Sequence, residues 1–184
     1  MRSVAMGLAL LLAACGPSTS EPQKNELRQT PAMPPAPAWA TDSVTLYLPD
    51  TVIEDRISAQ ALGAYIRELQ AAALEVFTTS PAPSGKSGAL VVMVKPGRVA
   101  RSWIVTGDAI EPAFRTKIDT AMAAVIPPEV VGGPVVFGLL FSAWGGGMPP
   151  NGMPMPIPES WDGLSALGPR VMDDRFYEDV WNLP

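Results

Sequence analysis

Residues 89–105 read ALVVMVKPGRVARSWIV, two apolar runs on either side of the four residues Lys95-Pro96-Gly97-Arg98. The run from Ala89 to Val94 is continuously apolar and rich in valine, and the run from Val99 to Val105 follows the two-residue repeat of a strand. Proline fixes φ at the start of a turn, and glycine accepts positive φ. The stretch therefore predicts two antiparallel strands joined as a hairpin.

A helix is predicted on each side of this hairpin in the sequence. The first has an apolar stripe at steps of four or three residues, made of Leu62, Ile66, Leu69, Ala73 and Phe77. Ser58 can cap it. The second has the stripe Ile110, Phe114, Ile118, Met122 and Val125, with Pro112 tolerated in its first turn. A long apolar strand is predicted from Val135 to Trp144, and a short strand from Val44 to Leu48.

Together these elements predict an α+β domain with an antiparallel sheet of three or four strands and two helices on one face. Two arrangements remain open. If the Val44 strand stays outside the sheet, the Val135–Trp144 strand forms an edge. If it joins, the order β-α-β-β-α-β describes a ferredoxin-like split βαβ, with the Val44 strand beside the last strand. The two arrangements differ in which edge of the sheet is free.

The order of elements from Ala59 to Trp144 resembles the C-terminal periplasmic domain of TonB and TolA type proteins. The resemblance lies in the segments Ala64–Leu69, Val92–Val99, Ile118–Met122 and Pro128–Phe141. Pro96 departs from the family, which usually has an acidic residue or Asn there. The resemblance implies that the last strand offers its edge to an extended partner segment, bound by main-chain hydrogen bonds. The implied partner-binding residues are Val135, Phe137, Leu139, Phe141 and Trp144.

The N-terminus has the charged Arg2, an apolar run from Val4 to Ala14, and then the lone cysteine, Cys15. The run is shorter than the roughly 20 apolar residues that a membrane-spanning helix needs. Residues 12–15 read LAAC, and with Gly16 next they resemble the lipobox of a bacterial lipoprotein signal. The resemblance implies that Cys15 carries a covalent lipid and begins the mature chain. Gly16 in place of Asp after the cysteine implies an outer-membrane location, on the periplasmic face.

The chain is therefore expected to have four segments: a signal peptide at 1–14, a lipid anchor and Pro-rich tether at 15–41, the α+β domain at 42–144, and a tail at 145–184. The tail begins with a Pro-, Gly- and Met-rich loop and ends in an acidic segment. In that segment Met172, Phe176 and Val180 are four residues apart, which predicts a short amphipathic helix. This helix either packs on its own domain or docks into a partner.

The composition disfavours several classes of function. The chain has no histidine, one cysteine and a formal net charge of −5. The commonest general base and zinc ligands are thus missing, and no basic surface is expected to follow a nucleic acid. Gly85-Lys86-Ser87 resembles the end of a phosphate-binding loop, but Ser80 replaces its first glycine and a strand follows. We expect no enzymatic activity and no cofactor other than the lipid on Cys15.

The sequence thus leads to two hypotheses for function. The first is an outer-membrane lipoprotein that acts as a non-enzymatic interaction module and binds another envelope protein by a strand edge. The alternative is a periplasmic lipoprotein that binds a small ligand or Cu(I), for which the thioethers of Met148, Met153 and Met155 are soft enough.

Overall fold

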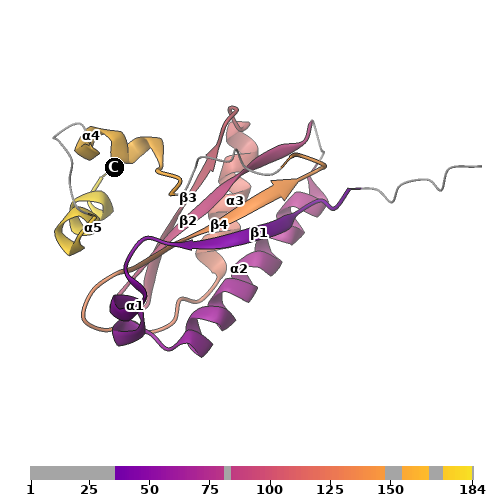
Figure 1. The fold of residues 1–184 in the computed structure, drawn as a ribbon. Coiled ribbons are helices and arrows are strands. Elements are labelled where there is room, and N and C mark those ends of the chain that lie inside the picture. The colour runs from indigo at the N-terminus through magenta and orange to yellow at the C-terminus, as the bar shows by residue number, and fades with distance from the viewer. Residues whose placement is uncertain (1–35, 81–83, 148–154, 166–171, 184) are drawn as a thin grey trace, which may run out of the picture. The chain divides into compact units, whose positions relative to one another are not determined.

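The computed structural model describes residues 36–80, 84–147, 155–165 and 172–183 (Figure 1). Its sheet contains four strands: β1 (Ala40–Leu46), β2 (Lys86–Lys95), β3 (Val99–Thr106) and β4 (Val135–Ala143). They lie in the order β1-β4-β2-β3, and all neighbours are antiparallel. The predicted α+β class with an antiparallel sheet is confirmed, and the strand containing Val44 joins the sheet beside the last strand.

Both helical crossovers in this sheet are split by a strand. Because neighbours are antiparallel, β1 and β2 run in the same direction with β4 between them, and β3 and β4 run in the same direction with β2 between them. The predicted hairpin connects β2 to β3, with Lys95 paired to Val99. Its turn places Gly97 at φ 89° and Arg98 at φ 57°. Glycine has no side chain, so Gly97 adopts its positive φ at no steric cost.

Helices α2 (Ala59–Thr79) and α3 (Pro112–Ala124) lie on one face of the sheet (Figure 1). The predicted cap of α2 is present, since Ala61 N–H donates to Ser58 Oγ at 3.2 Å. The buried residues of α2 are Leu62, Tyr65, Leu69, Ala73 and Phe77. Tyr65 and Phe77 meet Phe137 and Phe141 of β4, with ring centroids 6.3 Å and 5.6 Å apart. This face of β4 therefore forms the centre of the core.

A further helix, α1 (Asp50–Arg56), was not predicted from the sequence. It has only two turns and begins at Pro49-Asp50, a pair that is typical of a turn. Ile53 anchors α1 in the core. Arg56 holds it to the end of the chain, because its guanidinium donates to both carboxylate oxygens of Asp174 at 2.9 Å and 2.7 Å.

The opposite face of the sheet contacts the C-terminal segment, which contains a 3₁₀ turn (Glu159–Trp161), α4 (Asp162–Ser165) and α5 (Asp174–Trp181). Trp161 is fully buried and its ring meets Tyr47, just after β1, and Trp103 of β3. Tyr177 Oη donates to the Tyr47 carbonyl at 3.0 Å, and Tyr47 Oη donates to the Pro156 carbonyl. The core thus extends beyond the expected domain end at residue 144, and α5 packs on its own domain. Among the residues that the structure describes, no helix is long and apolar enough to cross a bilayer.

Candidate functional site

The strand edge that the sequence predicted as the partner-binding site is not an edge. β4 is paired along its length with β1 on one side and with β2 on the other. Four of its predicted contact residues, Val135, Phe137, Leu139 and Phe141, have no exposed surface. Trp144 follows the strand and donates from Nε1 to the Phe77 carbonyl at 3.0 Å. The prediction was wrong because β1 takes the position that a partner strand would have occupied.

The two edges of the sheet are β1 and β3. β1 is irregular, since its register shifts between Thr41 and Ser43, and such a bulge is one way in which proteins protect an edge from pairing. β3 pairs regularly with β2 through eight consecutive residues, Val99 to Thr106. Within the described ranges, β3 is the edge whose backbone is regular enough to accept another strand.

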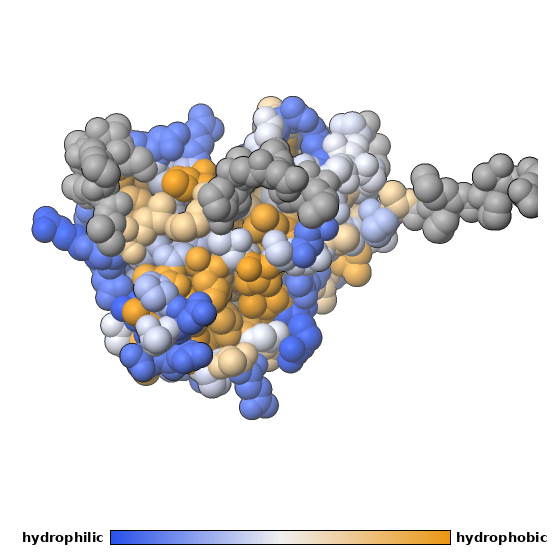
Figure 2. Space-filling view, viewed as in Figure 1, coloured by the Kyte–Doolittle hydropathy of each residue, from blue (hydrophilic) through white to orange (hydrophobic). Residues whose placement is uncertain are grey.

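Figure 2 shows apolar residues in the middle of the face that β1 crosses in Figure 1, with hydrophilic residues around them.

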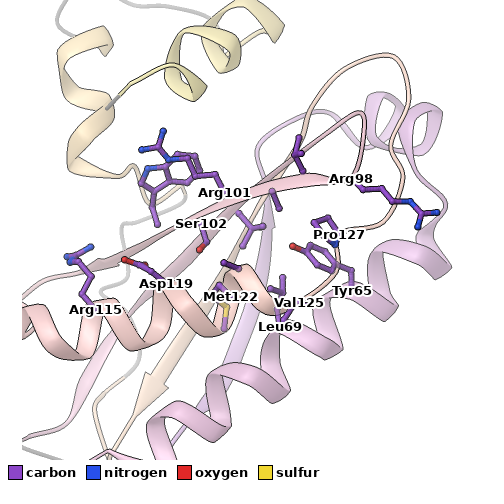
Figure 3. A pocket seen from close by; sticks show the side chains of 15 residues that line it. Tyr65, Leu69, Arg98, Arg101, Ser102, Arg115, Asp119, Met122, Val125 and Pro127 are labelled. Atoms are coloured by element: carbon purple, nitrogen blue, oxygen red, sulfur yellow. The ribbon is translucent and has the colours of Figure 1, made fainter.

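A cavity of about 520 Å³ lies between β3 and the two long helices; we call it the β3 cavity (Figure 3). Its walls come from β3 (residues 99–103), from α3 and from Tyr65 and Leu69 of α2. Leu69, Val92 and Met122 contribute apolar surface. The volume lies within the range of about 300–1,000 Å³ that is usual for ligand sites.

A few polar side chains also line the β3 cavity. They are Tyr65, Arg98, Arg101, Ser102, Arg115 and Asp119, from α2, α3 and the β2–β3 hairpin. Figure 3 shows the Tyr65 hydroxyl directed into the cavity, and Arg115 and Asp119 along one side of α3. Burial, with a smaller contribution from Glu68, raises the pKa of Tyr65 to about 12, so its hydroxyl stays a hydrogen-bond donor at neutral pH. Partial burial also raises the pKa of Asp119, against the opposing effect of Arg115.

The other face of β3 is held by the C-terminal segment. Arg101 donates from Nη1 to the Trp181 and Leu183 carbonyls at 3.1 Å and 2.7 Å, and its guanidinium lies 5.2 Å from the Trp103 ring centroid. Beside it, at the end of β2, Lys95 Nζ lies 2.6 Å from Glu178 Oε2. These contacts fix one face of β3, while the cavity opens on the other. The arrangement is a rigid edge strand beside a helix, with an apolar hollow and a few polar groups between them.

Sequence reasoning missed the polar residues of the β3 cavity. Tyr65 stands next to Ile66 of the predicted stripe, and Ser102 lies in a predicted strand. The available signal was Arg115 and Asp119, which are four residues apart and therefore on one face of α3. Nothing in this spacing indicated that β3 would be the edge facing them.

Three of the predicted site residues lie outside the described residues. Cys15, Met148 and Met153 fall outside them, and Met155 packs, half-buried, against the core. The structure describes no group of three or more His, Cys, Asp or Glu side chains that could hold a metal ion within its ranges. Lys86 of the rejected phosphate-loop motif begins β2, and its Nζ lies 3.3 Å from Asp108 Oδ2. Comparisons of the chain with protein-family models, with curated proteins and with solved structures found no match.

Proposed function

We propose that this protein is a lipoprotein, anchored through Cys15 at the periplasmic face of the outer membrane, and that it binds an extended segment of another envelope protein without catalysing a reaction. The anchor rests on the LAAC motif at residues 12–15 and the apolar run before it. The binding strand is β3 in place of β4, because β3 has an open side.

The observation that carries this proposal is a regular edge strand next to a cavity. A peptide that pairs with β3 would extend the sheet beyond this edge, so its alternate side chains on the helix face would point toward α3 and the β3 cavity. Each added main-chain hydrogen bond contributes only about 0.5–1.5 kcal/mol net. Most of the selectivity must therefore come from the side chain that fills the cavity.

The lining of the cavity predicts which side chain that is. Leu69, Val92 and Met122 favour an apolar group, while the Tyr65 hydroxyl donates a hydrogen bond at its inner wall. A segment of alternating residues with one medium-sized apolar or amide side chain meets both demands. A strongly charged side chain there would lose its hydration, and Arg115 in the lining would also repel a cationic one.

Two exposed valines provide a matched test of which edge binds. Val99 on β3 and Val44 on β1 are 45% and 43% exposed. A photo-crosslinking amino acid placed at either position, in the full chain and in intact cells, reports what lies beside each edge. We expect a discrete adduct from position 99 and a much weaker one from position 44. Equal adducts, or an adduct only from position 44, contradict the proposed edge.

The cavity has its own matched pair of variants on α3. Ala123 and Ala113 are both exposed alanines of this helix, but only Ala123 lines the β3 cavity. Ala123→Trp should fill the cavity and abolish the adduct from position 99, whereas Ala113→Trp should leave it intact. An adduct that survives Ala123→Trp would show that the partner does not use this cavity.

The anchor is tested separately from the binding surface. Labelled palmitate should be incorporated into the wild-type chain and not into a Cys15→Ser variant, which should also leave the membrane fraction. If the label persists in Cys15→Ser, or if the variant stays equally membrane-bound, the lipoprotein assignment is incorrect.

A further inference from the structure

A second cavity, of about 460 Å³, lies where α2 ends and α3 begins; we call it the aromatic cavity. Its apolar walls include the rings of Phe77, Phe114, Phe141 and Trp144. Phe77 lies at the centre of this group, with ring centroids 5.0 Å from Phe114 and 4.9 Å from Trp144. An aromatic wall of this kind provides a large apolar contact area for a ligand that lies against it.

The aromatic cavity also contains a polar group that the fold leaves unsatisfied. Ser80 follows α2, is 8% exposed and lines the cavity. Its Oγ has no hydrogen-bond partner among the residues that the structure describes. A buried hydroxyl without a partner costs about 1–3 kcal/mol. A ligand that hydrogen-bonds to Ser80 would recover part of this cost, so the cavity favours a ligand with a polar end.

The charges around the cavity favour an anionic end. Lys86, Lys117 and Glu111 line it, which gives two positive charges and one negative charge. Lys86 is paired with Asp108, while no acidic partner of Lys117 lies among the described residues. α3 begins beside it with Pro112 and has no side-chain cap at Glu111, so the positive end of the helix dipole is also available. Lys117 lies in the second turn of the same helix.

We propose that the aromatic cavity binds an anionic single-chain amphiphile of the fatty-acid type. The acyl chain lies among the four aromatic rings, and the carboxylate interacts with Lys117, the first turn of α3 and the Ser80 hydroxyl. The described part of the chain begins beside this cavity, since Trp144 N–H donates to the Pro37 and Ala38 carbonyls at 3.2 Å and 3.3 Å. If Cys15 is anchored as proposed, the 22 residues from it to Pro37 keep the cavity within about 80 Å of a bilayer, a source of such molecules.

Calorimetric titration with sodium dodecanoate, below its micellar concentration, tests this inference. The protein is the chain from Gly16 onward, because every residue of the buried core lies between Trp39 and Val180. We expect one dodecanoate per chain. Lys117→Gln should weaken the affinity three- to tenfold, and dodecyltrimethylammonium, with the same chain and a positive head, should bind at least tenfold more weakly.

The matched alanines again serve as the control. Ala113 lines the aromatic cavity and Ala123 lines the β3 cavity. Ala113→Trp should abolish dodecanoate binding, and Ala123→Trp should leave it unchanged. If Ala113→Trp fails to fold, as judged by its thermal melt, Lys117→Glu replaces it, with an expected loss of tenfold or more.

The inference is overturned if dodecanoate does not bind, if both tryptophan variants bind it equally, or if the cationic amphiphile binds as tightly. The proposed function is tested by a different measurement, the adduct at position 99. That adduct should be lost in Ala123→Trp and kept in Ala113→Trp. Loss of dodecanoate binding therefore cannot be confused with loss of the partner.

Discussion

Replacing Trp161 by alanine should destabilise the whole domain, although this residue lies in the tail that the sequence separated from it. Trp161 is completely buried, with 0% relative exposure. Its ring meets Tyr47, just after β1, and Trp103 of β3, at centroid distances of 6.3 Å and 5.3 Å. It also meets Phe176 and Tyr177 of α5, at 5.9 Å and 6.3 Å. It thus connects the sheet to the last helix.

The magnitude follows from this burial. Truncating a buried tryptophan to alanine costs about 3–5 kcal/mol, and each aromatic pair contributes about 0.5–1.5 kcal/mol beyond its buried area. Because domains are stable by only about 5–15 kcal/mol, Trp161→Ala should remove a large part of the unfolding free energy. Conservative replacement with phenylalanine should recover much of the loss, since it restores ring contacts.

Urea unfolding followed by far-UV circular dichroism measures this change. Trp181 is a control in the same segment, because it is only half-buried and its ring is 5.0 Å from Lys95 Nζ. Trp181→Ala should cost about 1–2 kcal/mol, clearly less than Trp161→Ala. If Trp161→Ala changes the unfolding free energy by less than about 1 kcal/mol, the C-terminal segment does not pack on the sheet as described.

Three further predictions concern the fold around the site. Arg56→Ala should cost about 1–3 kcal/mol and Asp174→Ala less, because Arg56 also donates to the Pro134 carbonyl at 2.6 Å and Asp174 is half exposed; equal losses in urea unfolding would contradict this. Stability should be flat between about pH 7 and pH 9 and fall between pH 10 and 12, because an unfolded tyrosine loses its proton near pH 10 whereas Tyr65 keeps it to about pH 12. Tyr65→Phe should reduce that slope by up to about 1.4 kcal/mol per pH unit, and an unchanged slope would mean that Tyr65 is not buried as described. In amide hydrogen exchange, β4 should be the most protected strand and β3 should include fast-exchanging amides; an exposed-edge pattern in β4 would restore the original prediction.

The sequence predicted the elements of the fold well because their signals are local. The hairpin turn depends on Pro96 and Gly97, and the cap of α2 depends on Ser58, so neither needs knowledge of distant residues. The position of the Val44 strand was left open, and with it the identity of the free edge. That choice depends on pairing between β1 and β4, whose partner residues are about 90 to 100 positions apart, and no local pattern encodes it.

The binding residues were harder to predict for the same reason. The residues from Val135 to Phe141 form a nearly continuous apolar run, a pattern as typical of a central strand as of a binding edge. The β3 cavity combines Tyr65, Ser102 and Asp119 from three elements, so it appears only once the sheet order is fixed. Whether the tail after Gly145 belongs to the core could not be predicted, because its proline-rich loop has no periodic pattern that indicates the burial of Trp161.

Whether β3 binds an extended partner is decided by comparing crosslinkers at positions 99 and 44 in living cells. We expect a discrete adduct at position 99 that disappears when Ala123→Trp fills the β3 cavity. An adduct at position 44 with none at position 99 would contradict it.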